Sequence, residues 1–313
     1  MKGRKPSLII LAAGASSRMK KSLEALQSEQ KNNSSSTIPA LSLNPGLSAH
    51  KGLIPLDDQG QTAIDLLLDQ AYRAGITRVI MIIQPPGTAF KKHFEKSNPV
   101  IPEKQKASKT LKDKKTKDKI TIDFAYQKIP EGREKPLGTA DALHQCLEQF
   151  PELLNEEFIV CNADNLYSKD AFLALIKAPS ENALIGYHRR GLNFPLSKIR
   201  NFALLVTNQQ GCMTQLIEKP DEKITQSLSA QGQDLNVSMN LWKFKGSDIW
   251  PSLEQCPMHP ERLEKELPAA VKLMITNHDI KLRVIPRNEH VPDLTQASDI
   301  GAVKHFLNQE SKD

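Results

Sequence analysis

Short apolar runs alternate with segments of helical spacing over the first 177 residues of the chain. The apolar runs have the length of strands, and the segments between them place apolar residues three and four positions apart. The predicted strands are residues 7–11, 78–83, 120–126 and 158–161, and the predicted helices are residues 62–74, 90–96 and 139–150. Since parallel strands are usually joined by a helix, this order predicts an α/β fold with a mostly parallel sheet and helices on both faces.

From residue 178 onward the pattern changes to strand-like runs separated by loops. These runs are residues 183–187, 202–206, 213–218 and 237–244, followed by a strand at 280–285. Only residues 261–275 are typical of a long helix there, and residues 299–308 predict a last helix. This half is expected to add antiparallel or mixed strands to the sheet.

Two segments, residues 21–50 and 103–119, have no such pattern and are interpreted as flexible surface insertions. The second holds eight lysines and three acidic residues, so it carries +5 of the chain's formal net charge of +6. Solvated lysine runs are common, and the rest of the chain is almost neutral. The basic composition therefore predicts no specific nucleic-acid partner.

Cysteine usage and hydropathy indicate the compartment. The four cysteines, Cys146, Cys161, Cys212 and Cys256, have neither zinc-site spacing nor the pattern of a disulfide framework. No apolar run approaches the roughly 20 residues of a membrane span. The first residues imitate a signal peptide, but a first strand explains their short apolar run better. We expect a cytoplasmic protein with reduced thiols and no membrane partner.

Residues 11–19, LAAGASSRM, follow the first predicted strand. Residues with almost no side chain let backbone N–H groups approach a bound anion, and Arg18 adds a charge that can clamp phosphate oxygens. The spacing is neither that of the P-loop nor that of the dinucleotide-binding fingerprint. Small-residue turns after strands are also common for structural reasons alone.

Three further segments contain candidate functional residues, each of which also has an ordinary structural explanation. Asp164 follows a buried strand, at the sheet edge where α/β folds bind ligands, although an Asp there can also cap the next turn. Thr139 can cap a helix that starts after Gly138. Glu218 and Lys219 precede a proline, where an exposed pair of charges would be unremarkable.

In chain order, these segments resemble the sugar-1-phosphate nucleotidyltransferases. The loop matches the family signature LAAGxxxRM, residues 136–140 match PLGTA, and residues 218–220 match EKP. The hexose-1-phosphate thymidylyl- and uridylyltransferases show the strongest similarity. The resemblance implies a Rossmann-like three-layer α/β/α fold of the GT-A type with a mixed sheet. It also implies one domain, residues 1–313, with a nucleotide-binding half at 7–177 and a sugar-phosphate-binding half at 178–308.

The resemblance assigns a role to each matching residue. It implies catalytic roles for Arg18 and Lys51, which would hold the triphosphate, and for Lys219, which would hold the sugar phosphate. It implies Mg²⁺ as cofactor, with Asp164 and Asp293 as ligands. The implied nucleotide-binding residues are Leu11, Ala12, Ala13, Gly14, Gln127, Gly138 and Thr139, and the implied sugar-phosphate-binding residues are Glu218, Lys219 and Asn240. Without the family, Lys51 is a solvated lysine and Asp293 a residue of a Pro-containing turn.

The implied reaction is NTP plus sugar 1-phosphate giving NDP-sugar plus pyrophosphate, with UTP or dTTP as the favoured nucleotide. The sequence departs from the family around the sugar, with Ser238, Met239 and Asn240 in place of Asn-Thr-Gly and Ala203 in place of a glycine. A cytidylyltransferase-like enzyme with a non-sugar acceptor such as phosphocholine is therefore an alternative. A non-catalytic nucleotide-binding protein is a second alternative.

Overall fold

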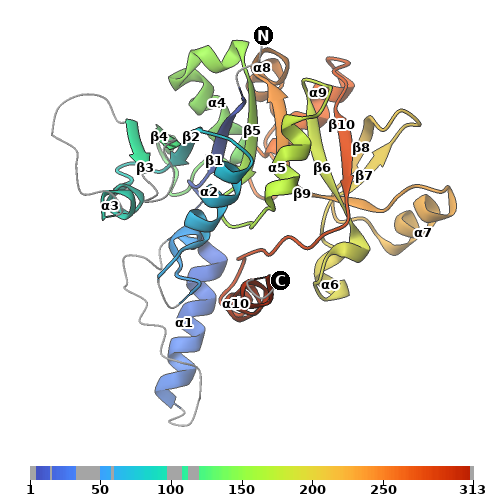
Figure 1. Ribbon diagram of the computed structural model, residues 1–313. Helices are drawn as coiled ribbons and strands as arrows, with labels where there is room; N and C mark the ends of the chain where they lie inside the picture. The colour runs from blue at the N-terminus through green and yellow to red at the C-terminus, as the bar shows by residue number, and fades with distance from the viewer. Residues whose placement is uncertain are drawn as a thin grey trace.

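The computed structural model describes residues 5–14, 16–32, 50–57, 60–96, 108–111 and 120–310. These residues form a mixed ten-stranded sheet between two layers of helices (Figure 1). The strands are β1 (Ser7–Leu11), β2 (Arg78–Ile83), β3 (Ser108–Leu111), β4 (Ile120–Tyr126), β5 (Glu157–Asn162), β6 (Ala183–His188), β7 (Leu204–Thr207), β8 (Met213–Ile217), β9 (Asn236–Lys245) and β10 (Arg283–Arg287). The sheet order is β10-β6-β9-β5-β1-β2-β4-β3, and β7 pairs with β8 and β9.

The centre of the sheet is parallel. Strand β1 lies between β2 and β5 and runs parallel to both, with Leu8 opposite Val79 and Ile159. These strands are buried on both faces, which explains their continuous apolar runs. In the second half, β9 runs antiparallel to β5 and β6. The predictions of a parallel first half and a mixed sheet are both confirmed.

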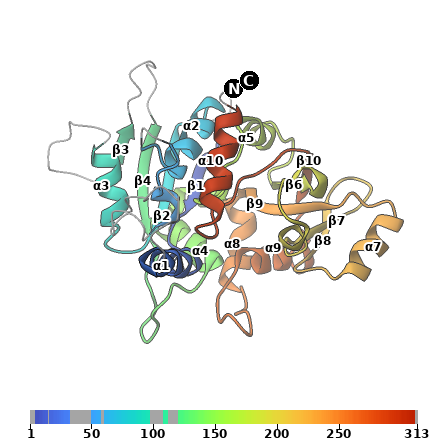
Figure 2. The ribbon, with the colours of Figure 1, turned by 90° about the horizontal axis from the view of Figure 1, so that it is seen from below.

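Helices cover the two faces of the sheet (Figure 2). The longer helices are α1 (Ser17–Asn32), α2 (Ala63–Arg73), α3 (Thr88–Lys96), α4 (Thr139–Gln149), α5 (Lys169–Ile176), α7 (Glu222–Ala230), α8 (Gly246–Glu254), α9 (Leu267–Thr276) and α10 (Asp299–Glu310). Helices α2, α3 and α5 pack with Leu8 and Ile10 of β1, whereas α4, α8 and α9 pack with Ile9. Alternate residues of one strand therefore serve two cores, giving the Rossmann-like three-layer arrangement.

Helix α1 corrects the expectation that residues 21–50 are an insertion without structure. It extends away from the sheet beside α10 (Figure 1). Met19 and Leu23, one turn apart, pack in the same buried cluster as Ile300 and Val303 of α10. The segment is poor in large apolar residues, so its apolar face is recognised only through this long-range contact. Residues 33–49 lie outside the described residues.

A strand replaces part of the second expected insertion. Residues 108–111 form β3, which pairs antiparallel with β4 at the end of the sheet order. Lysines are common on edge strands because they discourage further pairing, so a lysine-rich segment is compatible with this position. The other residues of 103–119 lie outside the described residues.

The second half contains more helix than the sequence predicted. Helix α7 was missed because its described side chains are not buried, and it begins at the Asp221 cap. Helix α8 contains Pro251, which obscures its pattern. Helix α9 begins at Leu267 rather than at residue 261, with Pro268 in its first turn, where proline is tolerated. The short helices are α6 (Leu196–Ile199), η1 (Lys51–Leu53), η2 (Pro151–Asn155) and η3 (Arg189–Gly191).

All four cysteines are free thiols, and three of them are buried. In the described part of the chain, no helix combines the length and the apolar character that crossing a bilayer would require.

Candidate active site

The carboxyl ends of β1 and β5 lie side by side. Leu11, the last residue of β1, is opposite Asn162, the last residue of β5. After Leu11 the chain remains tied to the neighbouring strand, because the Ala12 N–H donates to Ile82 O at 2.9 Å. Gln84, which directly follows the same strand, donates from its Nε2 to Ala13 O and holds the next part of the loop. The small-residue loop therefore starts from a fixed position at the sheet edge.

Three overlapping cavities open at this edge, and Arg18 and Asn162 line all of them. The first cavity, of about 380 Å³, is lined by Leu11, Ala13, Gly14, Arg18, Lys51, Gln127, Gly138, Thr139 and Asp164 among others. The second, of about 370 Å³, is lined by residues that include Phe202, Glu218, Lys219, Asn240, Arg262 and Glu266. The third, of about 650 Å³, is lined by residues that include Lys51, Asp164, Lys198, Lys219, Asn240 and Asp293.

The structure thus brings almost every predicted site residue to one connected space. Ala12 differs, because it is 7% exposed and lines none of the three cavities. Its small side chain serves packing against Leu8 and Ile10.

Gly138 and Thr139 hold the first cavity against the loop before α9. Gly138 has φ +114°, and a Cβ atom there would collide with the backbone of Lys265. The Thr139 hydroxyl accepts a 2.9 Å hydrogen bond from the Leu267 N–H. The N-cap of α4 is Gly138, without a side-chain cap bond, so the interpretation of Thr139 as the cap was wrong. Packing against Lys265 is enough to require glycine.

Gln127 closes the same wall from the end of β4. It is 2% exposed, and its Nε2 donates to Gly138 O at 2.9 Å and to Asp141 Oδ2 at 2.8 Å. These bonds fix the side-chain amide where it lines the cavity.

Lys51 and Asp164 form an ion pair in the first and third cavities. Lys51 Nζ lies 2.9 Å from Asp164 Oδ2, and both side chains are less than one quarter exposed. Burial raises the pKa of Asp164, Lys51 opposes that rise, and Asp293 adds to it. Lys51 reaches this position because η1 passes close to the end of β5. A Cβ atom added to Gly52 would lie only 3.3 Å from the backbone oxygen of Ala163.

Backbone hydrogen bonds place Asp293 beside Asp164. The Leu294 N–H donates to Asp164 O at 2.9 Å, and the Leu166 N–H donates to Pro292 O at 2.9 Å. The carboxylate of Asp293 accepts from the Thr295 hydroxyl at 2.6 Å and lies 3.0 Å from Lys198 Nζ, both on Oδ2. Its Oδ1 has a longer contact, 3.4 Å, with Asn165 Nδ2.

The two carboxylates fit a divalent cation such as Mg²⁺. They are hard oxygen donors, both line the third cavity, and the proximity of Asp293 raises the pKa of Asp164. Each has its Oδ2 held by a lysine, and Oδ1 of Asp293 has only the long 3.4 Å contact with Asn165, which a cation could replace. Asp164 and Asp293 are therefore the residues that would hold the metal.

Several residues that line the cavities have a strained backbone conformation with positive φ. Among the described residues other than glycine, five have positive φ, and three of these, Ser16, Lys219 and Asn240, line the cavities. Such conformations cost free energy and persist where the surrounding structure fixes them, often at functional sites. Lys219 and Asn240 both line the second and third cavities.

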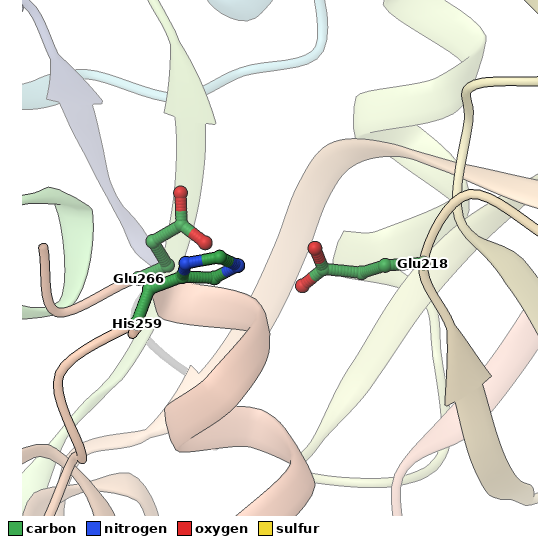
Figure 3. Close-up of side chains that lie close together, drawn as sticks. All are labelled: Glu218, His259 and Glu266. Carbon is green, nitrogen blue, oxygen red and sulfur yellow. The ribbon is translucent and has the colours of Figure 1, made fainter. Parts of the chain in front are cut away.

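Glu218, His259 and Glu266 form a cluster at the second cavity that has the residue types of a metal site. Figure 3 shows Glu218, from the end of β8, facing His259 and Glu266 from the chain before α9. Arg262 already lies between the carboxylates, 3.2 Å from Glu218 and 2.5 Å from Glu266. His259 Nδ1 accepts the N–H groups of Glu261 and Arg262, so the neutral ring carries its proton on Nε2. The cluster is organised around an arginine rather than around an open metal site.

Sequence reasoning missed Arg262 and Lys198. Both line the third cavity and contact acidic residues of the site. Arg262 lies in a segment predicted as helix, and Lys198 precedes no motif. Of these two residues, only Arg262 has a connection to a motif that the sequence shows, because its partner Glu218 belongs to the EKP segment.

Comparison with known proteins identifies a family for the chain. A family model described as nucleotidyl transferase matches residues 47–313, which include Lys51, Asp164, Lys219 and Asp293. The loop at residues 11–19 precedes the matched region. A comparison with curated proteins gave no match. Because the matched region covers most of the chain and contains the acidic pair with its lysines, this protein belongs to the nucleotidyl transferase family.

Proposed function

We propose that the protein transfers a nucleoside monophosphate from an NTP to a sugar 1-phosphate, releasing pyrophosphate. Family membership supports nucleotidyl transfer in general. The observation that carries the finer proposal is that Arg18 lines all three cavities. The small-residue loop, the acidic pair and the Glu218–Lys219 segment therefore surround one space, large enough for two phosphate-bearing substrates.

The proposed chemistry is an in-line attack by an oxygen of the acceptor phosphate on the α-phosphorus of the NTP. A phosphate monoester has a second pKa of about 6, so its attacking oxygen needs no general base near neutral pH. Arg18 and Lys51 hold the triphosphate, and Lys219 holds the acceptor phosphate. Asp164 and Asp293 hold Mg²⁺, whose contribution is neutralisation of charge on the phosphates. The remaining task of the protein is to position the reactants.

Within this proposal, residues 1–313 act as one domain. The nucleotide occupies the half formed by residues 7–177, and the acceptor occupies the half formed by residues 178–308. Glu218 and Asn240 contact the acceptor from the second cavity. We place the enzyme in the cytoplasm, which agrees with its four free cysteines. UTP or dTTP is the proposed donor.

A phosphocholine-type acceptor is the second candidate. The carboxylates of Glu218 and Glu266 and the ring of Phe202 line the second cavity. Carboxylates and aromatic rings both attract a quaternary ammonium group. Such an acceptor would compete with Arg262 for the two glutamates.

One assay tests both candidates. The purified chain is incubated with Mg²⁺, each of the common NTPs, and a panel of sugar 1-phosphates together with phosphocholine, and pyrophosphate is measured. Pyrophosphate with a sugar 1-phosphate supports the main proposal, and pyrophosphate with phosphocholine alone supports the second candidate. Silence across the panel combined with no NTP binding would overturn both.

A further inference from the structure

Lys198 is a partly buried cation that lines the third cavity beside its acidic residues. Its Nζ lies 3.0 Å from Asp293 Oδ2 and 3.4 Å from Asp299 Oδ1, and the side chain is 24% exposed. Its Nζ also lies 4.4 Å from the centre of the Phe194 ring. Two carboxylates and one aromatic ring therefore fix this ammonium at a place where no motif predicts a functional residue.

Lys198 repeats on Asp293 what Lys51 does on Asp164. Each lysine contacts Oδ2 of its aspartate, at 3.0 Å and 2.9 Å. The two aspartates carry two negative charges and the two lysines carry two positive charges, so the pair of carboxylates is neutralised without any metal. Asp299 adds one charge, but its Oδ2 is occupied by the N–H groups of Thr295 and Gln296.

We propose that Lys198, with Lys51, makes the acidic pair reject a bare divalent cation and accept one only together with a triphosphate. This inference rests on the proposed function. A bare divalent cation at the free carboxylate oxygens meets two nearby ammonium groups, and like charges repel strongly in an enclosed site. A triphosphate brings several negative charges, and both ammonium groups attract these charges. The repulsion that a bare cation meets is therefore offset when the cation arrives with a triphosphate. The site would thereby bind the reactive complex and ignore the free cation.

The proposal makes opposite predictions for two ligands. Replacing Lys198 with methionine keeps a long apolar side chain against Phe194 but removes the charge. Affinity for free cation should then rise, whereas affinity for the cation–nucleotide complex should fall. A purely structural role for Lys198 would weaken both, because Asp293 would lose its support.

The experiment measures Mn²⁺ binding to the full chain by electron paramagnetic resonance, with Mn²⁺ alone and with Mn²⁺ plus UTP, dTTP or CTP, without acceptor. We expect Lys198→Met to bind free Mn²⁺ about three- to tenfold more tightly than the unmodified protein, and the Mn²⁺–nucleotide complex at least about threefold more weakly. Lys198→Arg keeps the charge and should resemble the unmodified protein. Lys272→Met, at an exposed position of α9 outside the three cavities, is the matched control.

Unchanged or weaker binding of free Mn²⁺ by folded Lys198→Met would overturn the proposal, even if nucleotide binding remained normal. If the unmodified protein bound no Mn²⁺–nucleotide complex, the proposed function would fail first. The two failures are therefore distinguishable.

Discussion

Lys51 and Asp164 are 113 positions apart in the sequence, and their side chains form a 2.9 Å ion pair. The pair joins the short helix η1 to the carboxyl end of β5, at the edge where the cavities meet. Asp164 is thus held next to Asp293 although burial and the second carboxylate both raise its pKa. The two carboxylates thus present hard oxygen donors, the kind that Mg²⁺ takes together with phosphate oxygens, at one place on the sheet edge.

Replacing Asp164 with Asn should abolish metal-dependent turnover while the fold survives. The amide keeps the size of the side chain but loses the charge that would hold Mg²⁺. We expect pyrophosphate release to fall by about 100-fold or more at saturating nucleotide. Titration of activity with Mg²⁺ and a thermal melt measure the two effects.

Asp279→Asn makes the same chemical change at an exposed residue with φ +51°, which asparagine tolerates. It should leave activity and melting unchanged. Normal Mg²⁺-dependent turnover of Asp164→Asn would remove Asp164 from the metal site.

Replacing Lys219 with Met should affect the acceptor and spare the nucleotide. Lys219 lines the second and third cavities but not the first. Loss of one charge-assisted contact to the acceptor phosphate should raise the acceptor KM by about tenfold or more, with the NTP KM unchanged. Steady-state kinetics with each substrate varied in turn gives both values.

Lys223→Met changes an exposed lysine of α7, one turn further along the chain, and should alter neither KM. A higher NTP KM with an unchanged acceptor KM in Lys219→Met would instead place Lys219 at the triphosphate.

Replacing Gly138 with Ala should destabilise the protein far more than replacing Gly132. Both glycines have positive φ, +114° and +78°, so alanine strains the backbone at each. At Gly138 the added Cβ also collides with the Lys265 backbone, whereas at Gly132 it meets nothing within 4 Å. We expect the free energy of unfolding to fall by about 3 kcal/mol for Gly138→Ala and about 1 kcal/mol for Gly132→Ala. Urea denaturation followed by circular dichroism measures both, and equal losses would show that the collision is relieved.

The sequence predicted features that depend on a residue's immediate neighbours. Leu8 to Leu11 are apolar without alternation because β1 is buried on both faces, so the strand and its small-residue loop could be recognised directly. The helical spacing of residues 62–74 likewise predicts α2, whose start is fixed locally by a reciprocal capping box between Thr62 and Asp65. Asp164 could be placed at the sheet edge because it directly follows such a strand.

Features that depend on distant partners could not be predicted. The contact of Lys198 with Asp299 joins residues 101 positions apart, and that of Arg262 with Glu218 joins residues 44 positions apart. Helix α1 has an apolar side only once α10 lies beside Met19 and Leu23. None of these relationships leaves a period or a motif in the sequence, since the interacting elements carry no shared local pattern.

Stability should fall as the pH is lowered through the range in which His290 titrates. His290 packs between Phe194 and Phe306, and burial followed by the charge of Lys198 lowers its pKa from 6.5 to about 4. Between these values the unfolded chain takes up a proton that the folded protein does not, so stability rises with pH and is fully present only above about pH 6.5. After allowance for solvent screening, the loss between pH 7 and pH 4 from this residue should be about 2 kcal/mol.

His290→Gln removes the titration and can still accept the Asn193 N–H, which His290 Nδ1 accepts at 3.1 Å. Urea denaturation across this pH range should therefore show a shallower decline for the variant, and parallel curves for the two proteins would contradict the assignment.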